Sequence, residues 1–171
     1  SQPRTSEGGF WHKRVYPFQM WLDGIYMGEP YYAQYTATFD ADNEAAYADI
    51  VNQFLLVAKR TYDKETGLYR HAWDEIKALP WSDKSGRSAH VWGRALGWYM
   101  MAIVDALDYL PQDQPGRDKI ITILQGIVKN LAKYQDPQTG AWCQVIDQTG
   151  REGNYLEMSC TPMYAYAIAK G

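Results

Sequence analysis

The sequence VWGRALGWYMMAIVDALDYL at residues 91–110 predicts a helix that is apolar on nearly every side. Such a helix is stable only if other elements cover it from several directions. Residues 19–27 and residues 158–169 are similarly rich in apolar and aromatic side chains. We therefore predict that these segments also form buried helices.

Residues 44–59 and 117–134 predict the helices that cover them, since each segment has an apolar stripe on one face and polar residues on the other. The stripes are Tyr47, Ile50, Val51, Phe54 and Ala58 in the first segment and Ile120, Leu124, Ile127, Val128 and Leu131 in the second. Along the chain these amphipathic helices alternate with the buried ones. The alternation indicates two concentric layers of helices.

A weak internal repeat supports this arrangement. DKETGLY at residues 63–69 follows the first amphipathic helix, and DPQTGAW at residues 136–142 follows the second. Asp and Gly are typical turn residues, so both helices are expected to end in the same turn. Residues 8–12, GGFWH, look like a third, partly cut copy. Helical hairpins that repeat at this spacing, from residue 63 to residue 136, predict an all-α toroid, in which inner helices line an axis and outer helices cover them.

The chain has too few hairpins to close such a ring. Its 171 residues supply only about half a ring, which would leave apolar edges exposed. We therefore expect residues 1–171 to be one partial domain from the middle of a longer barrel, truncated at both ends.

The composition excludes several classes of function. A formal charge of -3, from 17 basic and 20 acidic residues, provides no basic face of the kind that nucleic acids require. No stretch is apolar for long enough to span a membrane, and the first residues lack the order of a secretory signal. Cys143 and Cys160 have no metal-ligand spacing, and we expect two free thiols. The sequence also lacks a Gly-rich phosphate loop and a serine nucleophile elbow, which disfavours phosphoryl transfer and serine-type hydrolysis.

Aromatic residues make up 15% of the chain. Large rings either fill a helical core or stack on flat ligands such as sugars, and both uses stay open for most of them. Asp23 lies beside Trp21 in the first turns of the buried segment 19–27. Burial raises the pKa of a carboxyl group, which suits a general acid working near neutral pH. The alternative is that Asp23 caps the helix or forms a salt bridge.

His71 and Trp73 come directly after the first turn of the repeat. The imidazole could bind or orient an anionic substrate, and the indole could stack on a sugar. An isolated His in a loop is, however, often only exposed to solvent or hydrogen-bonded.

Arg94 and Trp98 lie four residues apart and share one face of the buried helix. An Arg in such surroundings needs an anion, which is either a ligand or an internal carboxylate of a neighbouring helix. Gly93 and Gly97 each destabilise a helix by about 1 kcal/mol relative to Ala. Their presence indicates that a neighbouring backbone or a ligand approaches closely.

Four groups of motifs follow one another along the chain. They are GFWHK, YP, QMWLDG and YM in residues 9–27, GL and HAWD in residues 67–74, WGRA and GWY in residues 92–99, and EMS, TPM and AYA in residues 157–167. With these motifs the chain resembles the unsaturated rhamnogalacturonyl hydrolases, glycoside hydrolase family 105, over nearly its whole length.

The resemblance implies an (α/α)6 barrel that releases 4,5-unsaturated galacturonic acid from the non-reducing end of rhamnogalacturonan (pectin) oligosaccharides. In that family an Asp, matching Asp23, protonates the ring double bond at C4 and helps a water to add at C5. This reaction is hydration of a vinyl ether, in contrast to displacement between two carboxylates. The second active-site Asp of the family lies upstream of this chain, so we expect residues 1–171 alone to be inactive.

The resemblance also implies the other site residues, with no metal and no cofactor. His12 and His71 match active-site histidines, Arg94 matches the basic residue near the substrate, and Trp98 matches a ring that stacks on the sugar. Asp23 is the expected catalytic residue, and the expected substrate-binding residues are His12, Trp21, His71, Trp73, Arg94 and Trp98.

Two alternatives to this function stay open. A related toroid could act on unsaturated glucuronyl units from glycosaminoglycans or ulvan, or a non-catalytic toroid could only bind carbohydrate. The resemblance implies a bacterial protein, for which we expect a cytoplasmic location, with the periplasm as the alternative.

Overall fold

The computed structural model describes residues 2–171, so the predicted domain of residues 1–171 lies within it apart from Ser1. Most of the chain is helical, and two short strands pair in one antiparallel sheet. In chain order the elements are β1 (Gln19–Trp21), α1 (Leu22–Phe39), α2 (Glu44–Thr61), β2 (Ala72–Asp74), α3 (Gly93–Leu107), α4 (Arg117–Leu131) and α5 (Cys160–Lys170), with 3-10 turns at Ala132–Tyr134 and Ile146–Gln148. They confirm the predicted all-α fold.

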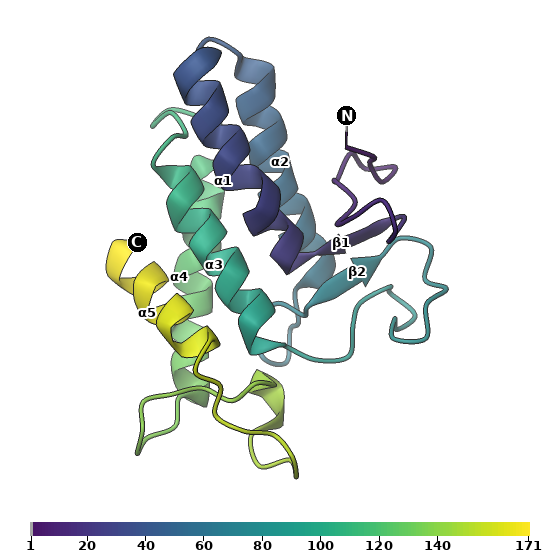
Figure 1. Ribbon diagram of the computed structural model, residues 1–171, viewed down its shortest axis with the longest axis vertical. Coiled ribbons are helices and arrows are strands. Elements are labelled where there is room, and N and C mark those ends of the chain that lie inside the picture. The colour runs from purple at the N-terminus through teal and green to yellow at the C-terminus, as the bar shows by residue number, and fades with distance from the viewer. Residues whose placement is uncertain (1) are drawn as a thin grey trace.

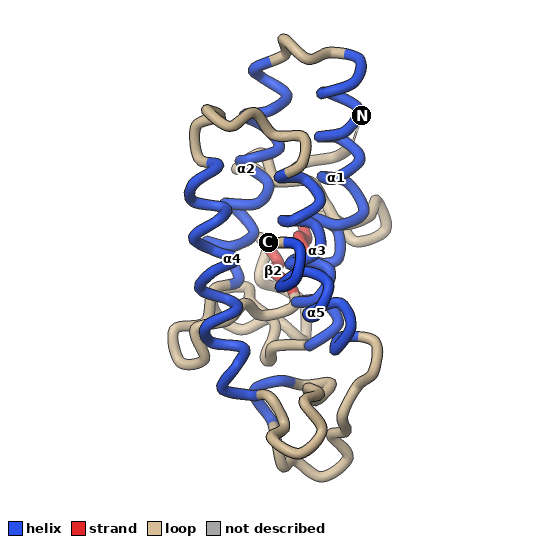
Figure 2. Tube along the Cα trace, turned by 90° about the vertical axis from the view of Figure 1, so that its left-hand side faces the viewer, coloured by secondary structure: helices blue, strands red, loops and turns tan. Residues whose placement is uncertain are grey.

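The helices form two layers. α1, α3 and α5 lie side by side in one layer, and α2 and α4 lie behind them (Figure 1). Figure 2 shows the same separation from the side, with α2 and α4 on one side and α1, α3 and α5 on the other. The most extensive contacts join α1 to α3 and α3 to α5. The inner layer is therefore an arc centred on α3, the helix that residues 91–110 predict.

The two outer helices confirm the predicted surface helices. α2 begins after Asn43, whose side-chain oxygen accepts a hydrogen bond from the backbone N–H of Ala46 at 2.9 Å and so caps the helix. The predicted stripes face the core, since Ile50, Phe54 and Ile127 are fully buried. Each outer helix thus covers the inner layer with the apolar face that its sequence period specifies.

The first inner helix differs from its prediction. Residues 19–21 form strand β1, and α1 then continues from Leu22 to Phe39, twelve residues beyond the predicted end at residue 27. Pro30 lies inside this helix and removes one backbone N–H. Ile25 and Ala33 are nevertheless buried on one face, so packing against α2 and α3 sustains the helix through the proline.

The internal repeat is confirmed as a repeated turn. Asp63 accepts hydrogen bonds from the backbone N–H of Thr66 at 3.2 Å and from its hydroxyl at 2.9 Å. Asp136 accepts from the same two groups of Thr139 at 2.8 and 2.7 Å. The glycine that follows each Thr has the same φ of 72°, a left-handed conformation that glycine adopts without strain. Both outer helices are therefore followed by the same exit turn.

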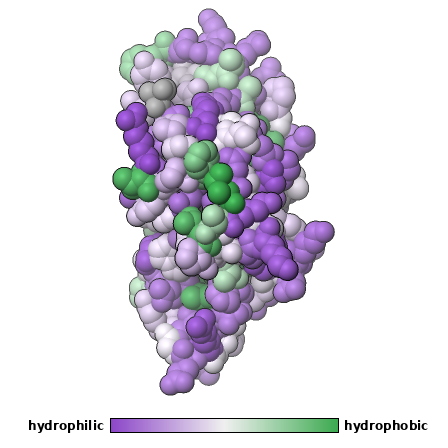
Figure 3. All heavy atoms as spheres, turned by 90° about the vertical axis from the view of Figure 1, so that its right-hand side faces the viewer, coloured by the Kyte–Doolittle hydropathy of each residue, from purple (hydrophilic) through white to green (hydrophobic). Residues whose placement is uncertain are grey.

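Exposed apolar side chains lie along α1. Met27, Tyr31 and Phe39 are 62%, 70% and 73% exposed, and they share one edge of the helix at intervals of four or eight residues. By contrast, the face on the right of Figure 1 is mostly hydrophilic, with scattered hydrophobic residues (Figure 3). Within residues 2–171, no helix has the length and apolar character needed to cross a lipid bilayer. The stripe therefore forms an exposed apolar edge along α1.

Candidate active site

The pairing of β1 with β2 brings two candidate residues together. Trp21 lies opposite Ala72 in the register, and the backbone N–H of Leu22 donates to the carbonyl of His71 at 3.0 Å. Asp23 and His71 adjoin this junction, and Asp23 Oδ2 lies 2.9 Å from His71 Nε2. The two side chains are only 16% and 23% exposed. The predicted catalytic carboxyl group is thus hydrogen-bonded to an imidazole and largely shielded from solvent.

Three nearly parallel rings lie beside this pair. His12 stacks on Trp21 with ring centroids 4.3 Å apart and planes 9° apart, and Tyr16 stacks on Trp21 at 5.0 Å and 15°. His71 meets the same indole edge-on at 5.1 Å. The backbone N–H of His12 donates to the carbonyl of Gln19 at 2.7 Å, which fixes the N-terminal segment against β1. Such a wall of rings can pack against the apolar face of a sugar.

His12 is held close to the start of α1. Its Nδ1 atom is buried and has no hydrogen-bond partner within residues 2–171. Gly24 leaves room for it, since a Cβ at that position would lie 2.9 Å from this nitrogen. Burial lowers the pKa of His12, and the nearby charge of Asp23 opposes that effect. The neutral imidazole is therefore favoured near neutral pH, in a form that can hydrogen-bond to a sugar hydroxyl.

The start of α3 continues the site. The guanidinium carbon of Arg94 lies 4.2 Å from the ring centroid of Trp92, and this ring lies 4.8 Å from that of His71. Asp23, His71, Trp92 and Arg94 thus form one contiguous row. Arg94 also forms an ion pair with Glu157, so its internal anion is a Glu that precedes α5. Since 36% of the Arg94 side chain is exposed, it remains accessible to a ligand.

The two glycines beside Arg94 allow close approach of other parts of the chain. A Cβ at Gly93 would lie 3.1 Å from the carbonyl oxygen of Cys143, and a Cβ at Gly97 would lie 2.8 Å from the sulfur of Met163. The expectation that a neighbouring backbone or a ligand approaches closely is confirmed at Gly93 and is wrong at Gly97. The neighbour is backbone at Gly93 and a side chain of α5 at Gly97.

The two remaining tryptophans of the predicted set lie in different surroundings. Trp98 is partly exposed, and its ring centroid lies 4.7 Å from that of Tyr26 on α1. Trp73 is only 3% exposed, and its indole N–H donates to the carbonyl of Ser85 at 3.2 Å. Trp73 pairs with the buried Met20 in the register, and cross-strand partners share one face of a sheet. This face packs on the core, so the prediction that Trp73 stacks on a sugar is corrected.

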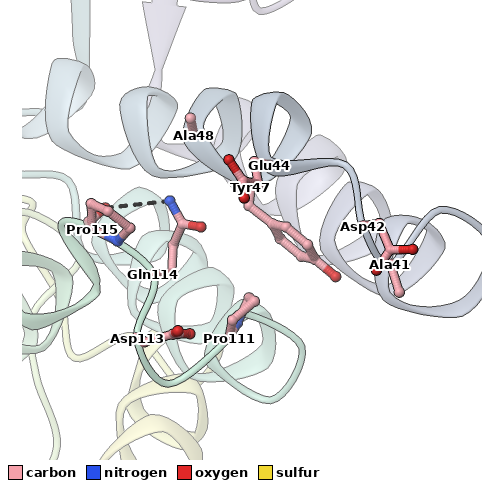
Figure 4. A pocket seen from close by; sticks show the side chains of 9 residues that line it. All are labelled: Ala41, Asp42, Glu44, Tyr47, Ala48, Pro111, Asp113, Gln114 and Pro115. Carbon is pink, nitrogen blue, oxygen red and sulfur yellow. Dashed lines mark hydrogen bonds between the residues drawn. The ribbon is translucent and has the colours of Figure 1, made fainter.

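A hollow of ≈ 600 Å³ lies away from these residues. Figure 4 shows its lining, with Tyr47 on α2 facing Pro111 and Gln114 of the connection between α3 and α4. Asp42, which also lines it, follows the C-terminal end of α1, whereas Asp23 is in the first turn. An α-helix of this length spans roughly 27 Å, so the hollow and the candidate site lie at opposite ends of α1.

Sequence reasoning missed Tyr16, Trp92 and Glu157 as members of the site. Each belongs to a motif named above. Tyr16 begins YP, Trp92 begins WGRA two residues before Arg94, and Glu157 begins EMS. Their place beside predicted residues was the only signal. Within the described residues, no group of three or more His, Cys, Asp or Glu side chains is arranged to hold a metal ion. Cys143 and Cys160 are both free thiols, as expected.

Comparison with known proteins identifies the relatives of this chain. The model of the family described as Glycosyl Hydrolase Family 88 matches residues 1–171. The chain is 36% identical over 148 residues to Protein Atu3128 of Agrobacterium fabrum, a match that covers 84% of this chain and 60% of that protein. It is 29% identical over 171 residues to the unsaturated rhamnogalacturonyl hydrolase YesR of Bacillus subtilis, covering 97% of this chain and 46% of that protein.

Solved structures resemble the chain closely in fold. A C. acetobutylicum glycoside hydrolase from family 105 has a TM-score of 0.96 and 46% identity, and the match covers 100% of this chain and 47% of that one. A possible family 105 member from Salmonella enterica has a TM-score of 0.82 and 29% identity, with coverage of 99% and 43%. The chain therefore spans about half the length of the solved relatives.

Proposed function

The chain belongs to glycosyl hydrolase family 88, and from this membership we propose that the polypeptide containing it releases 4,5-unsaturated galacturonic acid from the non-reducing end of rhamnogalacturonan oligosaccharides. The observation that supports the chemistry most directly is the 2.9 Å contact between Asp23 Oδ2 and His71 Nε2 beside a wall of rings. The contact holds a single shielded carboxyl group next to a surface on which a sugar can pack.

In the proposed reaction Asp23 is the proton donor. Its carboxyl group gives a proton to C4 of the ring double bond, and the developing positive charge at C5 is captured by a water. Asp23 then takes a proton from that water, so the carboxyl group is regenerated. The resulting hemiketal opens and releases the remaining sugar. His71 keeps the carboxyl group oriented through its Nε2 contact.

The charge of the substrate fits the second half of the site. An unsaturated uronate carries a carboxylate, and Arg94 presents a partly exposed guanidinium in the same row of residues as Asp23. Arginine binds carboxylates through several N–H donors at once. The activity in the name of the Bacillus subtilis relative supports a rhamnogalacturonan product as the substrate.

We further propose that residues 1–171 are about half of a closed (α/α)6 toroid. The exposed apolar edge of α1 and the 47% coverage of the C. acetobutylicum structure support this. The remaining hairpins would cover that edge and supply the second active-site Asp. We therefore expect no turnover by residues 1–171 alone, and turnover by that piece would contradict the proposal.

The test is a spectrophotometric assay of the full-length polypeptide that contains this chain. Unsaturated rhamnogalacturonan disaccharide should lose the ultraviolet absorbance of its conjugated double bond, and Asp23→Asn should lower kcat by about 100-fold or more. The control Asp42→Asn makes the same chemical change at an exposed carboxylate just beyond the far end of α1 and should leave kcat unchanged.

The outcome also separates the alternatives. Faster decay with an unsaturated glucuronyl disaccharide would replace the proposed substrate by a glucuronyl unit. Binding of these sugars without any decay would show a carbohydrate-binding toroid without catalysis.

A further inference from the structure

Glu157 is a buried acidic residue at the edge of the candidate site. It lies three residues before the start of α5 and is 5% exposed. One carboxylate oxygen, Oε1, accepts hydrogen bonds from Arg94 Nη1 and from the hydroxyl of Ser159. The other oxygen, Oε2, is buried without a hydrogen-bond partner in residues 2–171. Within that range Arg94 is the only cation paired with this carboxylate.

The backbone of Glu157 is fixed on both sides. Its N–H donates to the carbonyl of Trp142 at 2.8 Å, and its carbonyl accepts from the hydroxyl of Thr161 at 3.0 Å. The carboxylate therefore projects from a segment anchored to the core, since Trp142 is itself 7% exposed. The long side chain of Arg94, which pairs with this anchored carboxylate, therefore loses most of its rotamer freedom.

Arg94 needs an external restraint of this kind. It stands in the first turn of α3, where the positive end of the helix dipole disfavours a cation, and that turn contains no acidic residue. Its flexible side chain would otherwise sample many rotamers in solvent. The observed guanidinium instead lies over Trp92, 4.2 Å from the ring centroid, with Nη1 turned to Glu157.

The remaining donors of Arg94 are left for a ligand. Within residues 2–171, Nε and Nη2 have no hydrogen-bond partner, and 36% of the side chain is exposed. The Trp92 ring under the guanidinium also contacts His71, which contacts Asp23. This chain of contacts connects the donors of Arg94 to Asp23, the expected proton donor, through two intervening rings.

We propose that Glu157 is a positioning residue, which holds Arg94 against Trp92 so that its outward N–H groups bind the carboxylate of the uronate substrate. This inference rests on the proposed function. Glu157 itself does not touch the substrate. Glu157 acts only through Arg94, so its effect on binding depends on the negative charge of the substrate carboxylate.

The experiment is a double-mutant cycle in the full-length polypeptide. The variants are Glu157→Ala, Arg94→Ala and their combination, each assayed with an unsaturated disaccharide and with its uronate methyl ester. We expect Glu157→Ala to raise KM for the free acid about tenfold, the effect of losing roughly 1.4 kcal/mol of binding. KM for the ester should change less than about twofold, and the double variant should match Arg94→Ala.

Two further variants keep the test decisive. Glu157→Gln retains the volume of the buried side chain, so it reports on the ion pair if Glu157→Ala does not fold, and it should raise KM for the free acid only. Glu152→Gln makes the same change of charge at an exposed position nearby and should change neither KM. A purely structural role for Glu157 would raise KM equally for acid and ester, or would add to the effect of Arg94→Ala, and either result would overturn the inference.

The failure of the proposed function is a separate outcome. Turnover by the wild-type protein with an unchanged KM in both Glu157 variants refutes only the positioning role. Without wild-type turnover, calorimetric binding of galacturonate to the same variants replaces the kinetic cycle. Binding that weakens in the Glu157 variants would then support the positioning role while refuting the reaction, and absence of binding by the wild type would refute both.

Discussion

Glu29 should make the stability of the folded protein depend on pH in an unusual direction. The residue lies on the buried face of α1, is 1% exposed, and its Oε2 has no hydrogen-bond partner among the described residues. Burial raises its pKa well above the ordinary value of 4.5, the charge of Asp49 raises it further, and Arg4 opposes this. The unfolded chain loses the proton near pH 4.5, whereas the folded chain keeps it. Stability should therefore fall by about 1.4 kcal/mol per pH unit from pH 4.5 up to the raised pKa.

The substitution Glu29→Gln tests this, because the amide has nearly the same volume and is neutral at every pH. We expect urea unfolding curves to show that the variant gains stability relative to the wild type as the pH rises from about 5, by about 1.4 kcal/mol for each unit inside that window. Glu65→Gln removes an exposed carboxylate, so its difference from the wild type should stay nearly constant. A difference between wild type and Glu29→Gln that is the same at every pH would refute the reasoning.

Three further predictions concern turns, thiols and the site. Gly67→Ala and Gly140→Ala should each destabilise the protein by about 1–2 kcal/mol, because both glycines have a φ of 72°. The loss should be larger at Gly67, where a Cβ would lie 2.6 Å from a side chain of α4, and equal losses in urea unfolding would contradict this. Burial raises the pKa of Cys160 to about 11, and Cys143 is more exposed, so peptide mapping after brief alkylation should find label at Cys143 first. Burial lowers the pKa of His12 below its ordinary 6.5, so the unfolded chain binds a proton more readily than the folded chain. The wild type should therefore lose stability relative to His12→Asn as the pH falls from about 7 to about 5.5. Parallel profiles of unfolding free energy against pH for the two proteins would exclude this.

Local patterns in the sequence were sufficient for the outer helices and their exit turns. Residues 44–59 and 117–134 show an apolar period close to that of a helix, and burial of Phe54 and Ile127 follows from it. The turns at Asp63 and Asp136 depend only on side chains and glycines within a few residues of each other. Such features are specified locally, because the atoms that form the hydrogen bonds are close in the chain.

The first inner helix shows where local patterns fail. Residues 19–21 are as apolar as a buried helix, yet they pair with residues 72–74, which lie more than fifty positions away. A short apolar run is compatible with either structure, and the partner decides. The same pairing decides the fate of Trp73, since its place opposite Met20 directs it into the core.

The sequence by itself determined the helical layers, the repeated turns and the family motifs that contain Asp23, His71 and Arg94, because periodicity and motif order are properties of the chain alone. Only the tertiary structure decided which of these side chains meet. The contact of Asp23 with His71 depends on the register of β1 and β2, and the ion pair of Arg94 with Glu157 joins residues 63 positions apart. Contacts between distant segments arise from the packing of whole elements, and no spacing within one segment encodes them.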